Sequence, residues 1–137
     1  MIEIGRMQLL YTGKSAAEPA IGKIGKYLGS GSGHFEGSRV SGEVSWSLYE
    51  NQSDQACDAY FTGQISPGDT DSIDFEMLGY FQRAAEADEW NLASGIRFRP
   101  NSDFHACFAN LVGLVEGVFN MRDYRHDYRV FAPICDI

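Results

Sequence analysis

Two polar residues separated by one position could carry out acid–base chemistry. Asp58 and Tyr60 lie in a run typical of a β-strand, so their side chains point to the same face. If that face lines a barrel interior, an apolar cavity would raise the pKa of the carboxyl towards values useful for proton transfer, and the phenol would donate a hydrogen bond. If the face is exposed, the pair is part of a polar surface. The sequence leaves both alternatives open.

Arg97 and Arg99 also share one face of an expected strand. Two guanidinium groups placed in this way could hold a carboxylate or an enolate oxygen through charge-assisted hydrogen bonds. The alternative is an exposed strand face whose arginines pair with acids of the neighbouring strand, where Asp74 and Glu76 are available. The sequence favours this second alternative.

His126 alternates with Tyr124 and Tyr128 near the end of the chain. A row of Tyr, His and Tyr inside a barrel would be suited to proton transfer. A polar rim on the edge of the barrel is the alternative that the sequence favours.

Further residues could contact a ligand. Trp46 lies on an apolar strand face, so core packing is its first interpretation and stacking on a flat ligand its second. His34 lies in a glycine-rich segment that could cover a barrel mouth. The predicted catalytic residues are Asp58, Tyr60 and Arg97, and the predicted substrate-binding residues are Trp46, His34, Phe75, Arg99, Tyr124 and His126.

No pattern in the sequence indicates a metal or a cofactor. The histidines lack His-x-His or His-Glu-x-x-His spacing, and the segment 29–33 lacks the Gly-Lys-Ser/Thr of a phosphate loop. Cys57, Cys107 and Cys135 are odd in number and lack Cys-x-x-Cys spacing, which argues against disulfides and structural zinc. Because no signal peptide is visible either, we expect a cytoplasmic protein.

Composition narrows the class of partner. The 137 residues carry a net charge of −8, which disfavours nucleic acid and anionic membranes. No apolar run approaches the roughly 18 residues needed to span a bilayer. Hydrophobic residues make up 44% of the chain, which is enough for a core. The seven Tyr and nine Phe exceed what a minimal core needs, so some could line a cavity for a small hydrophobic ligand, the expected partner, although a preference of aromatic residues for strands is the favoured explanation for any one of them.

The elements that must position these residues are strands. Glycines at 29, 31, 33, 37 and 42 favour tight turns or strongly bent strands over a helix. Period-two patterns predict strands over residues 2–12, 21–28, 39–49, 57–65, 72–81, 93–99, 111–119 and 124–132. Residues 82–89 are the best helix candidate, and 104–109 could form a short helix capped by Ser102 or Asp103. We expect one all-β domain over 1–137, an antiparallel closed or nearly closed barrel of about eight strands with one short helix.

Several short motifs occur in a characteristic order along the chain. They are Gly33-His-Phe-Glu-Gly37, Gly42-Glu-Val44 with Trp46, Cys57-Asp-Ala59, Arg97-Phe98, Asn110, Val112 to Gly117 and Tyr128-Arg-Val130. In these motifs the sequence resembles the domain of unknown function 3237 family of small β-barrels, which is related to allene oxide cyclase-like barrels. The resemblance covers nearly the whole chain, with departures at Tyr60, where the family often has Arg, and at Cys107, where it usually has Trp.

The resemblance implies cyclisation, isomerisation or hydration of unsaturated carbonyl compounds, reactions with which some members of the family are associated. We therefore expect a cofactor-independent enzyme that acts in this way on an unsaturated carbonyl or polyketide-like compound. Two alternatives from other classes remain. One is a non-catalytic carrier of a hydrophobic metabolite, and the other is a filled, structural barrel that self-associates, for example as a homodimer. Convergence of Asp58, Tyr60 and Arg97 on a cavity would favour the enzyme.

Overall fold

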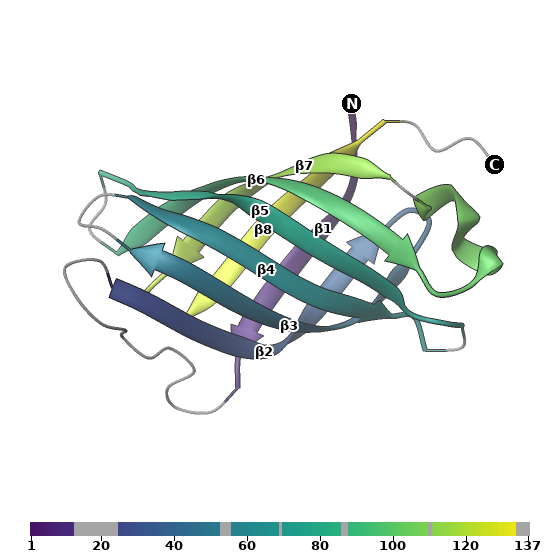
Figure 1. Ribbon diagram of the computed structural model, residues 1–137, viewed down its shortest axis with the longest axis horizontal. Coiled ribbons are helices and arrows are strands. Elements are labelled where there is room, and N and C mark those ends of the chain that lie inside the picture. Colours follow the sequence, from purple (N-terminus) through teal and green to yellow (C-terminus); the bar gives the residue numbers. More distant parts are fainter. Residues whose placement is uncertain (13–24, 53–55, 69, 86–87, 110, 134–137) are drawn as a thin grey trace.

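The computed structural model describes residues 1–12, 25–52, 56–68, 70–85, 88–109 and 111–133. Its elements are β1 (Ile2–Tyr11), β2 (Gly25–Gly37), β3 (Ser41–Gln52), β4 (Ala56–Ser66), β5 (Ile73–Arg83), β6 (Glu89–Pro100), the 3-10 helix η1 (Asp103–Phe108), β7 (Val112–Asn120) and β8 (Arg125–Ala132). Each strand pairs antiparallel with the next along the chain, and β8 pairs with β1 (Figure 1). The predicted antiparallel, closed barrel is therefore confirmed.

Alternation of apolar and polar residues explains why these segments form one curved sheet. In β4, Cys57, Ala59 and Phe61 are buried while the residues between them are exposed. The same alternation runs through β5 and β6. Each strand thus contributes one face to a common interior, and closure leaves no unpaired sheet edge.

The strand expected over 21–28 continues through the glycine-rich stretch to Gly37, and the turn follows at residues 38–40; residues 21–24 lie outside the described residues. All of segment 29–33 belongs to β2 and pairs with β1 and β3. A Cβ on Gly31 would lie 1.9 Å from the carbonyl oxygen of Leu10. Glycine is needed at this position because the backbones of β1 and β2 approach so closely.

The predicted helix over 82–89 is wrong in the part that the structure describes. Gln82 and Arg83 complete β5, Glu89 begins β6, and the Ala84 N–H donates to the Glu89 carbonyl at 2.9 Å; residues 86–87 lie outside the described residues. Pairing across the hairpin outweighs the helix propensity of the alanines and glutamates. The second helix candidate is the 3-10 helix η1, and no α-helix occurs among the described residues.

The interior has two halves of different character. One half, at the barrel end covered by η1, is packed with apolar side chains such as Ile65, Ile73, Phe98 and Phe108. The other half lies at the end where β1, β3, β5 and β7 finish, and it holds polar groups among aromatic rings. We call this the Glu50 end.

No helix among the described residues is long and apolar enough to cross a membrane.

Candidate functional site

A histidine lies completely buried inside the barrel at the Glu50 end. His126 points inward from β8 and is 0% exposed. Its Nδ1 contacts the hydroxyl of Tyr128, and its Nε2 lies 3.2 Å from the hydroxyl of Tyr11 on the adjacent strand β1. Both ring nitrogens therefore have phenol partners, and the burial of this polar ring is compensated by hydrogen bonds.

Aromatic rings enclose His126. Phe119 stacks on the imidazole with centroids 4.4 Å apart, while Trp46 and Phe61 approach it edge-on at 5.3 and 5.6 Å. Burial among these rings lowers the pKa of His126 to about 3. The imidazole is therefore neutral at physiological pH, so one nitrogen donates to a phenol oxygen and the other accepts from a phenol hydroxyl.

A carboxyl and a thiol form a second polar pair at the same end. The Sγ of Cys57 on β4 donates to the Oε2 of Glu50 on β3 at 3.3 Å. Burial raises the pKa of Glu50 to about 7, although the thiol hydrogen bond opposes the shift. Burial, followed by the Glu50 charge, raises the pKa of the Cys57 thiol. Near neutral pH the thiol therefore stays protonated, while the carboxyl exchanges its proton.

The His126 hydrogen bonds and the Glu50–Cys57 pair are electrostatically coupled. Burial and then the Glu50 charge raise the pKa of Tyr11, and both Tyr11 and Glu50 contribute to the raised pKa of the buried Tyr128. We refer to Tyr11, Glu50, Cys57, His126 and Tyr128 as the interior polar cluster. Glu50 is only partly buried, so the cluster reaches from the enclosed His126 to a partly exposed carboxyl near the end of β3.

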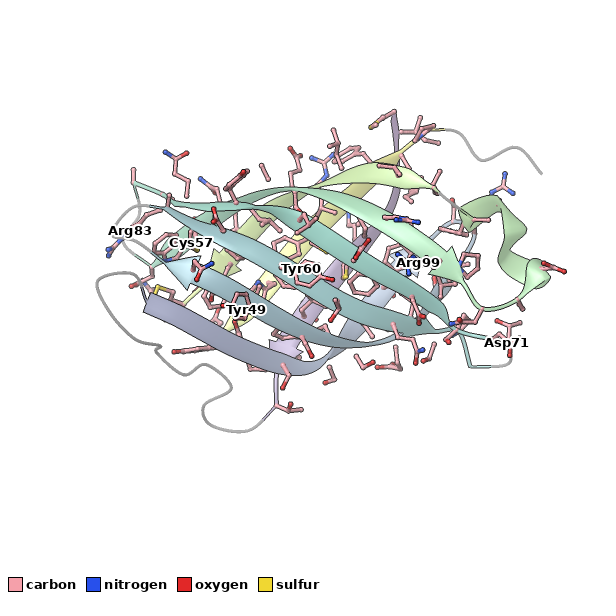
Figure 2. The ribbon with its side chains drawn as sticks, in the orientation of Figure 1. Tyr49, Cys57, Tyr60, Asp71, Arg83 and Arg99 are labelled. Atoms are coloured by element: carbon pink, nitrogen blue, oxygen red, sulfur yellow. The ribbon has the colours of Figure 1, made fainter. Side chains whose placement is uncertain are left out.

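The structure places the predicted catalytic residues on the outer face of the barrel. The Tyr60 hydroxyl donates to Glu76 Oε2 at 3.2 Å, and Arg97 and Arg99 lie 3.9 and 3.8 Å from Glu76 Oε1. Asp58 is exposed on the same side of β4 as Tyr60. Figure 2 shows Tyr60 and Arg99 on the wall of the barrel, with Cys57 at one end. The exposed-surface alternative thus applies to Asp58 with Tyr60 and to Arg97 with Arg99.

These outer residues line shallow depressions and do not converge on the interior. One depression, of about 480 Å³, includes Asp58 and Tyr60, and another, of about 300 Å³, includes Tyr60, Arg97 and Arg99. The geometry that would have favoured catalysis by Asp58, Tyr60 and Arg97 is therefore not found.

The predicted substrate-binding residues are divided between interior and surface. Trp46 lies inside, where its Nε1 donates to the Ser32 carbonyl at 2.9 Å. Phe75 is buried in the barrel wall. His34 lies outside, with its Nε2 3.2 Å from Glu36 and its Nδ1 3.6 Å from Glu43, and Arg99 is also outside.

The predicted Tyr-His-Tyr row is only partly interior. His126 and Tyr128 are buried, whereas Tyr124 is 50% exposed in the turn before β8 and packs its ring edge-on against Tyr11 at 5.4 Å. The interior alternative therefore holds for two of the three residues, and Tyr124 lies at the rim of the Glu50 end.

Sequence reasoning missed Tyr11, Glu50 and the hydrogen bond of Cys57. The signal for Glu50 was present, because Val44, Trp46, Leu48 and Glu50 alternate on one strand face. A carboxyl at the end of an apolar face is a candidate for a raised pKa.

In the described part of the chain, no three His, Cys, Asp or Glu side chains gather as a metal site requires.

The sequence matches no family model and no curated protein. Solved structures do share the fold. A protein with unknown function from Clostridium acetobutylicum ATCC 824 is 14% identical, with a TM-score of 0.79 over 97% of this chain and 98% of that one. A beta-barrel like protein from Acinetobacter baumannii AYE is 12% identical, with a TM-score of 0.80 over 95% and 92%.

A conserved protein of unknown function from Rhodopseudomonas palustris is 11% identical, with a TM-score of 0.75 over 94% of this chain and 95% of that one. At such identities the likeness establishes the barrel fold over nearly the full length of each chain. It assigns no activity.

Proposed function

We propose that the Glu50 end binds a small, uncharged, unsaturated carbonyl compound and catalyses its isomerisation, cyclisation or hydration by acid–base chemistry without a cofactor. The observation that carries this proposal is the Glu50 carboxyl, which ends the apolar face of β3 and accepts a hydrogen bond from the Cys57 thiol, and whose pKa burial raises to about 7. A group with this pKa is present in both protonation states at neutral pH, so it can both accept and return a proton.

The buried phenols and imidazole supply the complementary group, a hydrogen-bond donor for the carbonyl oxygen. If Nε2 of His126 carries the proton, it donates to the Tyr11 oxygen, and Tyr128 donates to Nδ1. The Tyr11 proton is then free to point to a ligand. Each hydrogen bond in such a chain polarises the next, which would strengthen donation as negative charge develops on the oxygen.

The surroundings favour a flat, uncharged ligand. The walls at the Glu50 end consist mainly of aromatic rings, among them Trp46, Phe119 and Tyr124. Contacts between these rings occupy the barrel around His126, so the reacting part of a ligand would lie above His126, next to Glu50 and Tyr11. The resemblance to the domain of unknown function 3237 family supports the same class of reaction.

A non-catalytic carrier is the second candidate, because the same aromatic walls would hold a hydrophobic metabolite whether or not Glu50 transfers protons. The two candidates differ in what happens to the ligand. A carrier releases it unchanged, whereas the enzyme exchanges one of its protons with solvent or rearranges it.

The test begins with native mass spectrometry of freshly purified protein to identify a bound compound. That compound is then incubated with the protein in D₂O, and deuterium incorporation and product formation are followed by NMR. Glu50→Gln keeps the size and hydrogen-bonding capacity of the side chain but cannot transfer the proton, so we expect a loss of about 100-fold or more.

Asp58→Asn is the matched control, since it makes the same chemical change on the outer face and should leave the rate unchanged. Wild-type rates in Glu50→Gln, or a loss confined to Asp58→Asn, would contradict the assignment of Glu50. Ligand binding with neither exchange nor product in the wild-type protein would favour the carrier.

A further inference from the structure

On the outer face of the barrel, most residues of β5 lie opposite a residue of β6 that differs from them in charge or in size. Facing one another across the two strands are Asp74 and Arg99, Glu76 and Arg97, Leu78 and Gly95, Tyr80 and Ala93, and Gln82 and Asn91. In the first two pairs β5 supplies an acid and β6 a base. In the next two pairs β5 supplies a large apolar residue and β6 a small one. The last pair joins two amides, each of which can donate and accept.

The large residues of this face project into solvent. Leu78 is 64% exposed and Tyr80 is 67% exposed, although each is apolar over most of its surface. Beside Leu78, Gly95 leaves a gap in the sheet surface. Exposed apolar side chains that form a contiguous group commonly mark an interaction surface.

The fold itself does not require glycine at position 95. A Cβ placed there would meet nothing closer than 3.8 Å, the carbonyl oxygen of Leu78. Glycine inside a strand weakens it and often marks a place where another chain approaches closely. The gap is therefore available to a side chain from outside the barrel.

We propose that this face is a homodimer interface, with a two-fold axis that runs parallel to the strands between β5 and β6. Rotation about this axis places β5 of one copy over β6 of the other, and residues that pair across β5 and β6 keep the same position along the strand direction. Leu78 then enters the gap at the partner's Gly95, and Tyr80 covers the partner's Ala93. Glu76 and Asp74 face the partner's Arg97 and Arg99. An interface of this isologous kind must be self-complementary, and these pairs satisfy that condition.

The neighbouring strands border the contact. Tyr60 on β4 lies beside Leu78, and Leu114 on β7 lies beside Gly95, in one cross-strand row. Because the barrel is closed, its outer surface turns away from the partner at β4 and β7. The apolar centre would thus lie on β5 and β6 and be bordered by ion pairs, as is usual for interfaces with an apolar core and a polar rim.

A second copy fits this face better than a lipid surface. Against the hydrocarbon of a bilayer the acids and arginines of β5 and β6 would gain no partners, and the net charge of −8 opposes approach to anionic lipid. Against a second copy, Glu76, which already lies near Arg97 and Arg99 of its own chain, and Asp74 would each also face an arginine of the partner.

Sedimentation velocity over a wide range of protein concentration tests the proposal, and the dimer fraction should rise with concentration. A Cβ at Gly95 meets no atom closer than 3.8 Å, so Gly95→Leu should fill the gap and raise the dissociation constant about tenfold or more. Leu78→Gly should weaken the dimer similarly. The double variant Leu78→Gly/Gly95→Leu moves each side chain to the opposite strand and should restore dimerisation, because the two-fold axis exchanges the strands.

Leu10→Ser is the control, because Leu10 is a 42% exposed leucine on β1, remote from β5 and β6. It should leave the dissociation constant unchanged, and circular dichroism should show the strand content of the wild-type protein in every variant. A monomer at all concentrations, a dimer insensitive to Gly95→Leu, or a double variant without recovery would overturn the proposal. So would a monomer that binds lipid vesicles through Leu78.

Discussion

The hydroxyl of Tyr128 is in hydrogen-bond contact with Nδ1 of His126, two residues earlier on the same strand, and both side chains are fully enclosed by the barrel. Neighbours on one strand face can bond in this way because their side chains point in the same direction. This contact fixes the imidazole orientation from one side, and Tyr11 fixes it from the other.

Removal of the Tyr128 hydroxyl should destabilise the protein. Tyr128→Phe keeps the ring but leaves a buried imidazole nitrogen without its partner, so we expect a loss of about 1–3 kcal/mol in the free energy of unfolding. Urea denaturation at neutral pH measures this loss. Tyr124→Phe removes a hydroxyl from a side chain that is 50% exposed and should change the stability little. Equal effects of the two substitutions would argue against a structural role for the His126 contact.

His126 should make the fold sensitive to acid. Its pKa is lowered to about 3 in the folded protein, whereas an unfolded histidine titrates near 6.5. Between these values the unfolded chain binds more protons, so the stability contributed by this group is lost as the pH falls from about 6.5 towards 3. NMR of the histidine rings should show His126 neutral at pH values near 5. A protonated His126 ring at that pH would contradict this prediction.

Glu50 should act with the opposite sign. Its pKa in the folded state, about 7, exceeds its ordinary value of 4.5, so the folded state binds more protons between these values. Stability is lost as the pH rises from about 4.5 to 7, by an amount on the order of 3 kcal/mol. Glu50→Gln should remove this loss and be more stable than wild type near pH 8 in thermal unfolding. A wild-type pH dependence in Glu50→Gln would show that another group is responsible.

Two glycines should respond very differently to alanine. At Gly31 a Cβ would lie 1.9 Å from a β1 carbonyl oxygen, so Gly31→Ala must displace one strand from another and should cost about 2 kcal/mol or more. At Gly95 the nearest atom is 3.8 Å away, so Gly95→Ala should be neutral or slightly stabilising. Thermal melts of both variants at low protein concentration would show the contrast, and a similar cost for the two would disprove it.

Alternation in the sequence predicted the strands, and the glycines within them favoured a barrel over a sandwich. The apolar positions of 57–65 and 72–81 recur with period two, and burial in the structure follows them. The hairpin between β5 and β6 was missed because Gln82 and Arg83 have high helix propensity, which cross-strand pairing overrides.

The candidate site was harder to predict, since alternation defines two faces without saying which is interior. Asp58 and Tyr60 lie opposite three apolar residues, and burial of those three turned the polar pair outward. Glu50 ends an otherwise apolar face, where a charged residue resembles the start of a turn. Its partner Cys57 comes from the next strand, and only the register of β3 with β4 brings the two together.

The pairing of β1 with β8 has a consequence for how the chain reaches its native state. Seven of the eight strand pairings join consecutive strands, but Ile2 must find Ala132 from the opposite end of the chain. Loop closure of this length carries the largest entropic penalty of any pairing in the barrel, so we expect it to form last and to limit the folding rate. A circular permutant in which a short linker joins β8 to β1 would turn that encounter into a local hairpin and should fold faster.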